Sequence, residues 1–96
     1  MKAIDISIVI PVYNSENILE ELNLQITRAL AKYSYEVILV NDKSPDNSWD
    51  KIVALTKINP NIRGISLKKN AGQDNAIMAG LGYASGEYVV VMDDDL

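Results

Sequence analysis

The chain has 96 residues, of which 48% are apolar, and its nine basic and thirteen acidic side chains give a formal net charge of −4. This composition is ordinary for a soluble globular domain, and the length suits one hydrophobic core. The chain has no cysteine and no histidine, which excludes disulfides, thiolate metal sites and Ser-His-Asp or Cys-His catalysis. Its basic residues form no cluster of the kind that binds nucleic acid, so no nucleic-acid partner is expected.

The amino-terminal residues give no sign of a targeting signal. They lack the pattern of a signal peptide and run directly into a stretch that is typical of a strand. The longest apolar runs of the sequence are far too short to span a bilayer. We therefore expect a cytoplasmic location.

The first predicted element is a strand over residues 5–12, which are rich in β-branched side chains. Pro11 has no N–H to donate, so the pairing of this strand should loosen there. Asn14 or Ser15 is expected to cap the helix that follows. Apolar side chains recur at helical spacing as far as Leu30.

The second strand is predicted at residues 36–40, a continuous apolar run. The pair Ser44 and Pro45 favours the start of a helix, with the serine as the capping residue and the proline at the first helical position. Residues 59–61, Asn-Pro-Asn, should end that helix. A third and weaker strand is expected over residues 62–67.

A polar, basic turn at residues 68–73 leads to a third helix, predicted over residues 74–84. Gly80 lowers helix propensity, so we expect its backbone to pack closely on the sheet. The last predicted strand, residues 88–92, is apolar throughout and is expected to be buried on both faces. Three consecutive aspartates, residues 93–95, follow it.

Alternating strands and helices with apolar strands predict an α/β fold, a three-layer αβα arrangement around a mostly parallel sheet. Right-handed crossovers favour the strand order 3-2-1-4. All four strands then end along one edge, and ligands bind in the crevice between strands 1 and 4. Tyr13, Asn14, Asp42 and the segments 68–73 and 93–95 should converge at that crevice.

The three aspartates leave two interpretations open. Adjacent carboxylates repel one another, and a divalent cation would relieve this repulsion. Hard oxygen ligands suit Mg²⁺ or Mn²⁺. The alternative is an acidic strand end that is simply solvated.

The other converging residues also have two interpretations each. Tyr13 either supports a base or packs on the first helix, and Asp42 either accepts hydrogen bonds from a base or ribose or polarises its own turn. Lys68 and Lys69 either neutralise phosphates or are solvated, and Gly72 either lets an anion approach the backbone or only starts a helix. The sequence has neither a dinucleotide fingerprint nor a P-loop. The remaining combination favours a nucleotide diphosphate with a bound metal.

Four motifs in order carry a resemblance to a known family. They lie at residues 7–14, 40–48, 70–80 and 93–96. Together they resemble the amino-terminal half of the catalytic domain of inverting family 2 glycosyltransferases, which have the GT-A fold. Within that family the chain is most similar to the polyprenyl-phosphate sugar transferases, including bacterial dolichyl-phosphate mannosyltransferase-like enzymes.

The resemblance implies a site for a nucleotide sugar. The implied nucleotide-sugar-binding residues are Pro11, Tyr13, Asn14, Asp42, Lys69, Asn70, Gln73 and Asp93. Asp93 and Asp95 match the outer positions of an Asp-x-Asp motif and would bind a divalent cation, Mg²⁺ or Mn²⁺. The middle residue, Asp94, is expected to point to the other side, because side chains alternate along a strand.

The resemblance also implies the activity. A hexosyl group would move from a UDP- or GDP-sugar to an acceptor with inversion, and a polyprenyl phosphate is the candidate acceptor. The family places its general base after the Asp-x-Asp motif, so residues 1–96 would form the donor-binding part and be inactive alone. This part alone is expected either to be marginally stable or to self-associate through the edge of its last strand. The full-length protein would associate with the cytoplasmic face of a membrane.

The sequence departs from the family pattern at two places. Ser15 stands between the Tyr-Asn pair and Glu16, where many relatives have glutamate directly, and Asn41 and Lys43 replace an acid and a glycine. Three other interpretations stay open: a nucleotidyltransferase of related fold, a purely structural nucleotide-binding half, and a receiver-type signalling module that binds Mg²⁺. The first lacks its glycine-rich basic turn, and the last lacks the acids that it needs after strands 1 and 3.

Overall fold

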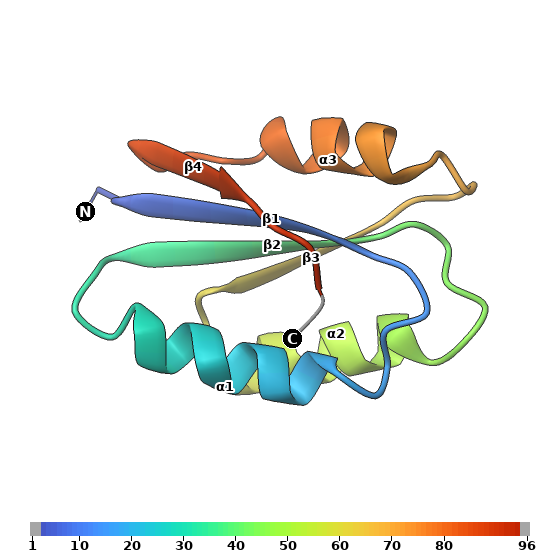
Figure 1. The fold of residues 1–96 in the computed structure, drawn as a ribbon, viewed down its shortest axis with the longest axis horizontal. Helices are drawn as coiled ribbons and strands as arrows, with labels where there is room; N and C mark the ends of the chain where they lie inside the picture. The colour runs from blue at the N-terminus through green and yellow to red at the C-terminus, as the bar shows by residue number, and fades with distance from the viewer. Residues whose placement is uncertain (1–2, 95–96) are drawn as a thin grey trace.

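A computed structural model describes residues 3–94 of the chain. It confirms the α/β class and the strand order, because four parallel strands form one sheet in the order β3-β2-β1-β4 (Figure 1). The elements in chain order are β1 (Ile6–Val12), α1 (Leu19–Ala29), β2 (Tyr35–Asn41), α2 (Ser48–Ile58), β3 (Ile62–Ser66), α3 (Gln73–Leu81) and β4 (Tyr88–Val91). None of the helices described is long and apolar enough to cross a membrane.

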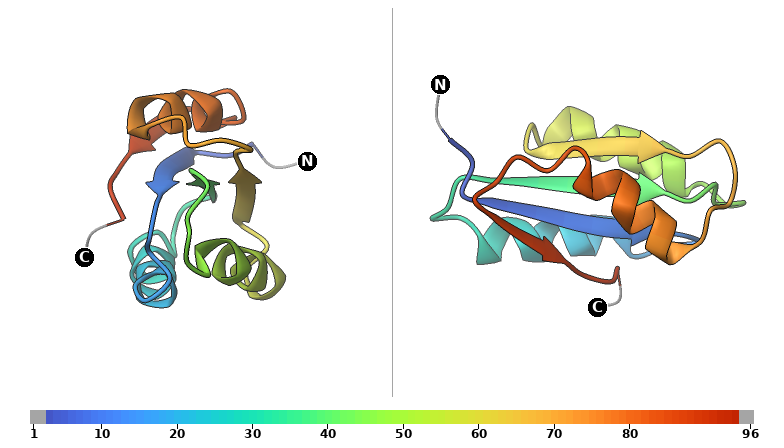
Figure 2. Two further views of the ribbon diagram at one scale, coloured as in Figure 1. Left: turned by 90° about the vertical axis from the view of Figure 1, so that its right-hand side faces the viewer. Right: turned by 90° about the horizontal axis from the view of Figure 1, so that it is seen from above.

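Helices cover both faces of the sheet, as predicted. Figure 2 shows α1 and α2 side by side on one face and α3 alone on the other. Alternation along β1 sends Ile8 and Ile10 into the larger core beneath α1 and α2, and Val9 into the smaller core beneath α3. The central strands β1 and β2 are therefore covered on both sides, which explains their continuous apolar runs.

Gly80 brings α3 close to the sheet, as the sequence predicts. A Cβ atom at this position would lie 2.5 Å from Cγ1 of Val9 and 3.0 Å from Cγ2 of Val40. Both contacts are too short for any side chain larger than hydrogen. The helix ends earlier than predicted, at Leu81, where Tyr83 N–H donates to the Gly80 carbonyl at 3.0 Å and tightens the last turn.

The predicted start of the second helix is wrong. The helix begins at Ser48, and the residue before it, Asn47, makes no side-chain capping bond. Asp46 lies one residue earlier, and its Oδ1 accepts from Ser48 N–H at 3.0 Å. Ser44 N–H instead donates to Oδ1 of Asn41 at 3.1 Å, which holds the residues before the helix in a loop. The Ser44-Pro45 pair therefore predicts the start of this helix about one turn too early.

The predicted cap of the first helix is wrong too. The helix begins at Leu19, and the residue before it, Ile18, makes no side-chain capping bond. The backbone N–H groups of Asn14 and Ser15 donate across the fold, to Oγ of Ser44 at 3.2 Å and to Oγ of Ser48 at 2.8 Å. The Ser15 hydroxyl donates to the Tyr13 carbonyl at 3.1 Å and to Asp94, so it is used away from the helix start.

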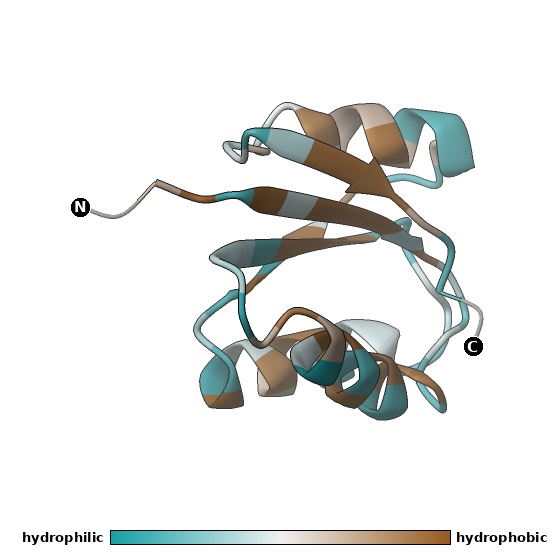
Figure 3. Ribbon diagram, turned by 60° about the vertical axis from the view of Figure 1, so that its left-hand side comes forward, coloured by the Kyte–Doolittle hydropathy of each residue, from teal (hydrophilic) through white to brown (hydrophobic). Residues whose placement is uncertain are grey.

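The prediction that the last strand is buried on both faces is also wrong. β4 lies at the edge of the described sheet, and Tyr88, Val89, Val90 and Val91 are 43–66% exposed. β4 pairs only with β1, and α3 packs on β1 and β2. Figure 3 shows the apolar colouring of β4 beside that of β1. An apolar run predicts burial, but within residues 3–94 no further element covers this strand.

Candidate functional site

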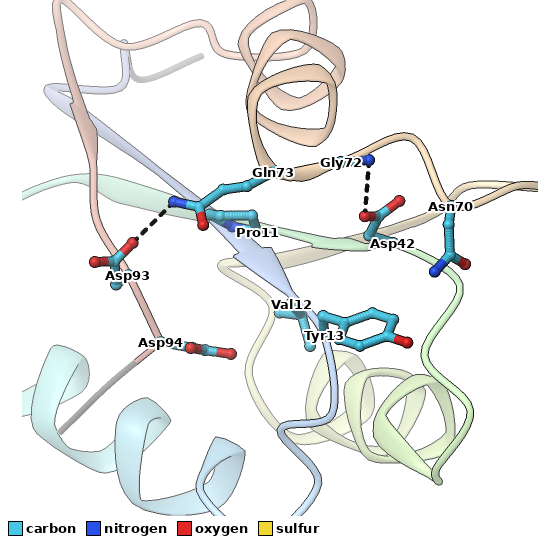
Figure 4. Close-up of a pocket in the computed structure, with 9 residues that line it drawn as sticks. All are labelled: Pro11, Val12, Tyr13, Asp42, Asn70, Gly72, Gln73, Asp93 and Asp94. Carbon is cyan, nitrogen blue, oxygen red and sulfur yellow. Dashed lines mark hydrogen bonds between the residues drawn. The ribbon is translucent and has the colours of Figure 1, made fainter.

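A pocket of about 480 Å³ lies where the carboxyl ends of β1, β2 and β4 meet the start of α3. Figure 4 shows the side chains that line it. They are Pro11, Val12, Tyr13, Asp42, Asn70, Gly72, Gln73, Asp93 and Asp94. This is the crevice beside strands 1 and 4 where a doubly wound sheet binds its ligands.

Pro11 explains why the sheet opens there. Val9 and Asp5 accept hydrogen bonds from β4, at 3.1 Å from Met92 N and 2.9 Å from Tyr88 N. Backbone groups alternate in direction along a strand, so those of Pro11 face β4 as well. Proline has no N–H to continue this ladder, and the pairing of β1 with β4 ends at Val9. Pairing with β2 continues to Val12, so the predicted loosening occurs on the β4 side alone.

Asp42 organises the turn that forms one wall of the pocket. Its side chain is buried, and one oxygen accepts from Ala71 N–H at 2.7 Å. The other oxygen accepts from Gly72 N–H at 3.1 Å (Figure 4). Gly72 has φ +91°, a left-handed conformation that favours glycine, so its N–H can face the carboxylate as α3 begins. The carboxylate thus holds the turn in place, and its remaining lone pairs stay available to a ligand.

Asn70 ties the same turn to the loop after β2. Its amide nitrogen, in the orientation that satisfies its surroundings, donates to the backbone oxygens of Lys43 at 3.2 Å and Asp42 at 3.3 Å. Leu67 N–H adds a bond to the Asn41 carbonyl at 2.9 Å. These bonds connect the turn to the end of β2 at several points.

Two carboxylates face the pocket from the segment after β4. Gln73 donates through Nε2 to Oδ1 of Asp93 at 3.2 Å (Figure 4). Ser15 donates through Oγ to Asp94. The prediction that Asp94 points away is wrong, because β4 ends at Val91 and strand alternation no longer applies three residues later. Each acid therefore has one neutral donor, Asp93 from the start of α3 and Asp94 from the loop after β1.

The third predicted acid, Asp95, lies outside the described residues. Within residues 3–94 no three acidic side chains are grouped closely enough to hold a metal ion. The described part therefore supplies two neighbouring carboxylates, Asp93 and Asp94, at the pocket. Mg²⁺ is commonly bound by one or two carboxylates together with water and substrate phosphates, so the donor set fits such an ion.

A buried hydrogen-bond network supports the loops beneath the pocket. Ser48 Oγ accepts from Ser15 N–H and donates to Oδ1 of Asp46 at 2.6 Å, while Glu16 N–H donates to Oδ2 of Asp46 at 3.3 Å. Burial raises the pKa of Asp46, but these hydrogen bonds outweigh burial and keep the pKa below its usual value. The network fixes Ser15, the donor to Asp94, against the start of α2.

The structure brings most of the predicted site residues together and leaves two aside. Pro11, Tyr13, Asp42, Asn70, Gln73 and Asp93 line the pocket. Asn14 and Lys69 are exposed and do not line it. Asn14 turns the chain instead, with φ +57°.

Sequence reasoning missed two residues that line the pocket, Val12 and Asp94. Val12 is the last residue of β1 and is buried, so it could have been found as the floor of a crevice at the strand end. Asp94 had no such signal. Its direction depends on where β4 ends and on the distant Ser15.

Comparison with known protein families decides what this pocket belongs to. The family model described as "Glycosyl transferase family 2" matches residues 7–96. The chain belongs to glycosyl transferase family 2. Membership leaves the receiver-type module without support, since that interpretation rested only on aspartates at strand ends.

Individual members agree with this assignment. A dolichol-phosphate mannosyltransferase of Pyrococcus furiosus is 41% identical over 91 residues, which are 95% of this chain and 26% of that protein. TarS of S. aureus, solved in complex with UDP, superimposes with a TM-score of 0.80 at 28% identity over 95% of this chain and 27% of its own.

A third relative confirms the fold alone. The mannosyltransferase PcManGT of Pyrobaculum calidifontis, solved with GDP-Man and Mn²⁺, has a TM-score of 0.84 at 23% identity, over 99% of this chain and 28% of its own. The GT-A fold predicted from the sequence is thereby confirmed. The family 2 chain spans only about a quarter of the length of these relatives.

Proposed function

We propose that the protein transfers a hexosyl group from a UDP- or GDP-sugar to an acceptor, with inversion at the anomeric carbon. In this proposal residues 1–96 form the donor-binding part of the transferase domain, and the general base lies after residue 96. One observation carries the proposal: in a family 2 chain, an aromatic side chain, a turn rich in backbone N–H groups and three carboxylates line one pocket.

The base and ribose are assigned to the wall formed by Tyr13, Pro11 and Asp42. The Tyr13 side chain is 48% exposed, which leaves its ring available to a planar base. Asp42 is fixed by two backbone N–H groups, so its remaining lone pairs are oriented before a ligand arrives. Of the other predicted contacts, Asn70 borders the pocket, while Asn14 and Lys69 would reach the nucleotide only from its rim.

The diphosphate is assigned to the acidic side of the pocket with a divalent cation, Mg²⁺ or Mn²⁺. Asp93 and Asp95 are the proposed ligands, as the outer acids of the Asp-x-Asp motif, and Asp94 stands beside them on the pocket wall. A bound cation would supply charge neutralisation for the departing nucleotide diphosphate. Gln73, which donates to Asp93, keeps that carboxylate turned toward the pocket.

The acceptor proposed is a polyprenyl phosphate. Its support is the relative from Pyrococcus furiosus, whose name states dolichol phosphate as the partner in mannosyl transfer. UDP in the TarS structure, and UDP-GlcNAc in another, support a nucleotide-sugar donor without selecting the base. The cytoplasmic location and the association with the cytoplasmic face of a membrane stay predictions, which cell fractionation tests.

Nucleotide binding by the intact protein tests the proposal. UDP and GDP, each with Mn²⁺, are titrated calorimetrically against the wild type, Tyr13→Ala and Asp42→Ala. We expect at least one nucleotide to bind and both variants to weaken it. Tyr33→Ala is the matched control, because Tyr33 is similarly exposed (55%) and lies at the end of α1, away from the pocket. Unchanged affinity in both variants would remove Tyr13 and Asp42 from the site.

A further inference from the structure

A second buried acidic group lies at the opposite end of the sheet from the pocket. Glu36, in β2, is only 4% exposed. Its Oε2 accepts three hydrogen bonds, from Ser7 Oγ at 2.6 Å, Ser85 N–H at 2.8 Å and Ser85 Oγ at 3.0 Å. Its Oε1 lies 3.6 Å from Nη1 of Arg63. This carboxylate does not line the pocket, yet it accepts three hydrogen bonds and lies near a guanidinium group.

The partners of Glu36 connect β1 and β3 to the segment that precedes β4: Ser7 lies in β1, Arg63 in β3 and Ser85 just before β4. Gly86 N–H donates to Ser7 Oγ at 2.7 Å. The Ser7 hydroxyl therefore bridges Gly86 and Glu36, since it also donates to the Glu36 carboxylate. A Cβ atom on Gly86 would lie 2.7 Å from both the N and the Oγ of Ser7, so only glycine allows this approach. Arg63 donates to the Tyr83 carbonyl at 3.3 Å and lies over its ring. We call Ser7, Glu36, Ser85 and Gly86 the β4 clamp.

β4 needs such a device because its own sequence does not define its register. Hydrophobic alternation specifies register when one face of a strand is buried and the other is not. In β4 the residues Val89, Val90 and Val91 are identical and almost equally exposed, at 43–46%. The ladder to β1 covers only Tyr88 to Val91. Each residue of slip would move the acids that follow β4 by about 3.3 Å.

We propose that the β4 clamp sets the register of β4 on β1 and thereby the position of Asp93 and Asp94 in the pocket. Glu36 is then a positioning residue for the proposed donor site, although it lies at the other end of the strands. The effect on donor binding rests on the proposed function. The effect on the register of β4 rests on the geometry alone.

Cross-linking measures the register without any ligand. Residues 1–96 contain no cysteine, so none within them competes with the introduced pairs. Ile6 pairs with Tyr88 in the structure, and neighbouring strands lie about 4.8 Å apart, within disulfide range. Ile6→Cys with Tyr88→Cys reports the native register, and Ile6→Cys with Val90→Cys reports a slip that keeps the same face. We expect only the first pair to oxidise when the clamp is intact.

The clamp is then weakened in three ways in the intact protein. Glu36→Gln removes the charge, Ser85→Ala removes one hydroxyl bond but keeps the Ser85 N–H, and Gly86→Ala pushes the start of β4 away from Ser7. We expect each to raise cross-linking of the slipped pair. Ser85→Ala keeps the test valid if Glu36→Gln does not fold.

Binding of UDP or GDP with Mn²⁺ supplies the functional measurement. We expect Glu36→Gln to weaken the apparent Kd about tenfold, which corresponds to about 1.4 kcal/mol. Tyr35→Phe is the matched control: Tyr35 is adjacent in β2 and equally buried, but it faces the core beneath α1 and α2. It should change the melting temperature and leave Kd within about twofold.

The outcomes separate the two proposals. Native cross-linking in all three variants, with a Kd change no larger than that of Tyr35→Phe, would show that the clamp only stabilises the fold. If the wild type binds neither nucleotide, the proposed function fails, while the cross-linking still decides the register.

Discussion

The two ends of the sheet treat acidic side chains in opposite ways. At the amino end, Glu36 is buried and accepts three hydrogen bonds from groups that the fold itself supplies. At the carboxyl end, Asp93 and Asp94 lie at the rim of a pocket, and one neutral donor is found for each. Glu36 is thus bonded by the fold itself, whereas Asp93 and Asp94 keep lone pairs that can bind a ligand. Substitutions at the amino end should therefore lower the stability of the fold in addition to the effect on nucleotide binding proposed above, whereas substitutions at the carboxyl end should act on the site and leave stability nearly unchanged.

The largest effect is expected at the carboxyl end, on catalysis. Asp95→Asn should slow sugar transfer by about 10²–10³-fold, or roughly 3–4 kcal/mol, because an uncharged amide is a weaker metal ligand and leaves the departing diphosphate less stabilised. Asp93→Asn should act in the same direction. Steady-state rates at saturating Mn²⁺ measure the effect, and a chelator should inhibit the wild type until Mn²⁺ is returned. Near-normal turnover of Asp95→Asn in chelator would exclude the metal role.

Asp94 sharpens this prediction. The strand pattern assigned it to the far side, but it lines the pocket and accepts from Ser15. Asp94→Asn should bind the metal less strongly than the wild type does. Its loss of rate should be smaller than that of Asp95→Asn, because the amide oxygen can still accept the hydrogen bond from Ser15. Unfolding free energies of all three variants should stay within about 0.5 kcal/mol of the wild type, as for other surface substitutions.

At the amino end the effect should fall on stability. Glu36→Ala removes the acceptor of three buried hydrogen bonds and leaves Ser7 and Ser85 without their partner. We expect the free energy of unfolding to fall by about 3 kcal/mol, a large share of the 5–15 kcal/mol typical of a domain. Urea unfolding of the intact protein measures it. A loss below about 1 kcal/mol would mean that water replaces the carboxylate without cost.

The pH dependence of stability should also originate at the amino end. Burial raises the pKa of Glu36, but the bonds from Ser7 and Ser85 and the charge of Arg63 outweigh burial and lower the pKa below 4.5. A lowered pKa means that this stabilisation is complete above the unfolded-state pKa and is lost as the pH falls through the folded-state pKa. Below about pH 4.5, Glu36→Gln should reduce the slope of stability against pH by up to about 1.4 kcal/mol per pH unit.

The exposed edge strand β4, which precedes Asp93 and Asp94, should give a smaller effect, on the association of the chain with itself. β4 is apolar and exposed, and Val90 and Met92 border an apolar groove of about 330 Å³ between β4 and α1. The 96-residue chain alone should therefore self-associate in sedimentation runs at increasing concentration. Val90→Lys should weaken this association about tenfold, because a charged side chain on an edge strand opposes pairing. A wild type that stays monomeric at every concentration would contradict the expectation.

The difference between the two ends also explains what the sequence could predict. The parallel sheet, its strand order, the role of Gly80 and the crevice at Pro11 follow from local chemistry and periodicity, and all were found. The start of α2 was not found, because the local bonds there are made by Asp46 and Asn41 and not by a capping Ser44. The direction of Asp94 was not found, because it depends on a hydrogen bond from Ser15, which is distant in sequence. The exposure of β4 was not predicted either, since an apolar run indicates burial but does not show which element covers it.

Backbone conformation provides the smallest test of the comparison. Lys43, in the loop after β2, has φ +52°, a left-handed conformation that costs a non-glycine residue about 1–2 kcal/mol. Glycine avoids that cost but loses about 0.5–1 kcal/mol more conformational entropy on folding, so Lys43→Gly should raise the unfolding free energy by at most about 1 kcal/mol.

Controls for Lys43→Gly come from the same loops. Asn14 has φ +57° but belongs to a residue type that tolerates this conformation, so Asn14→Gly should gain less than Lys43→Gly. Lys69 is exposed and has no positive φ, so Lys69→Gly should lower the unfolding free energy through the entropy term alone. Thermal unfolding of the three variants ranks them. If Lys43→Gly were as destabilising as Lys69→Gly, the loop would carry no strain, and the carboxyl end of the sheet would differ from the amino end only in its carboxylates.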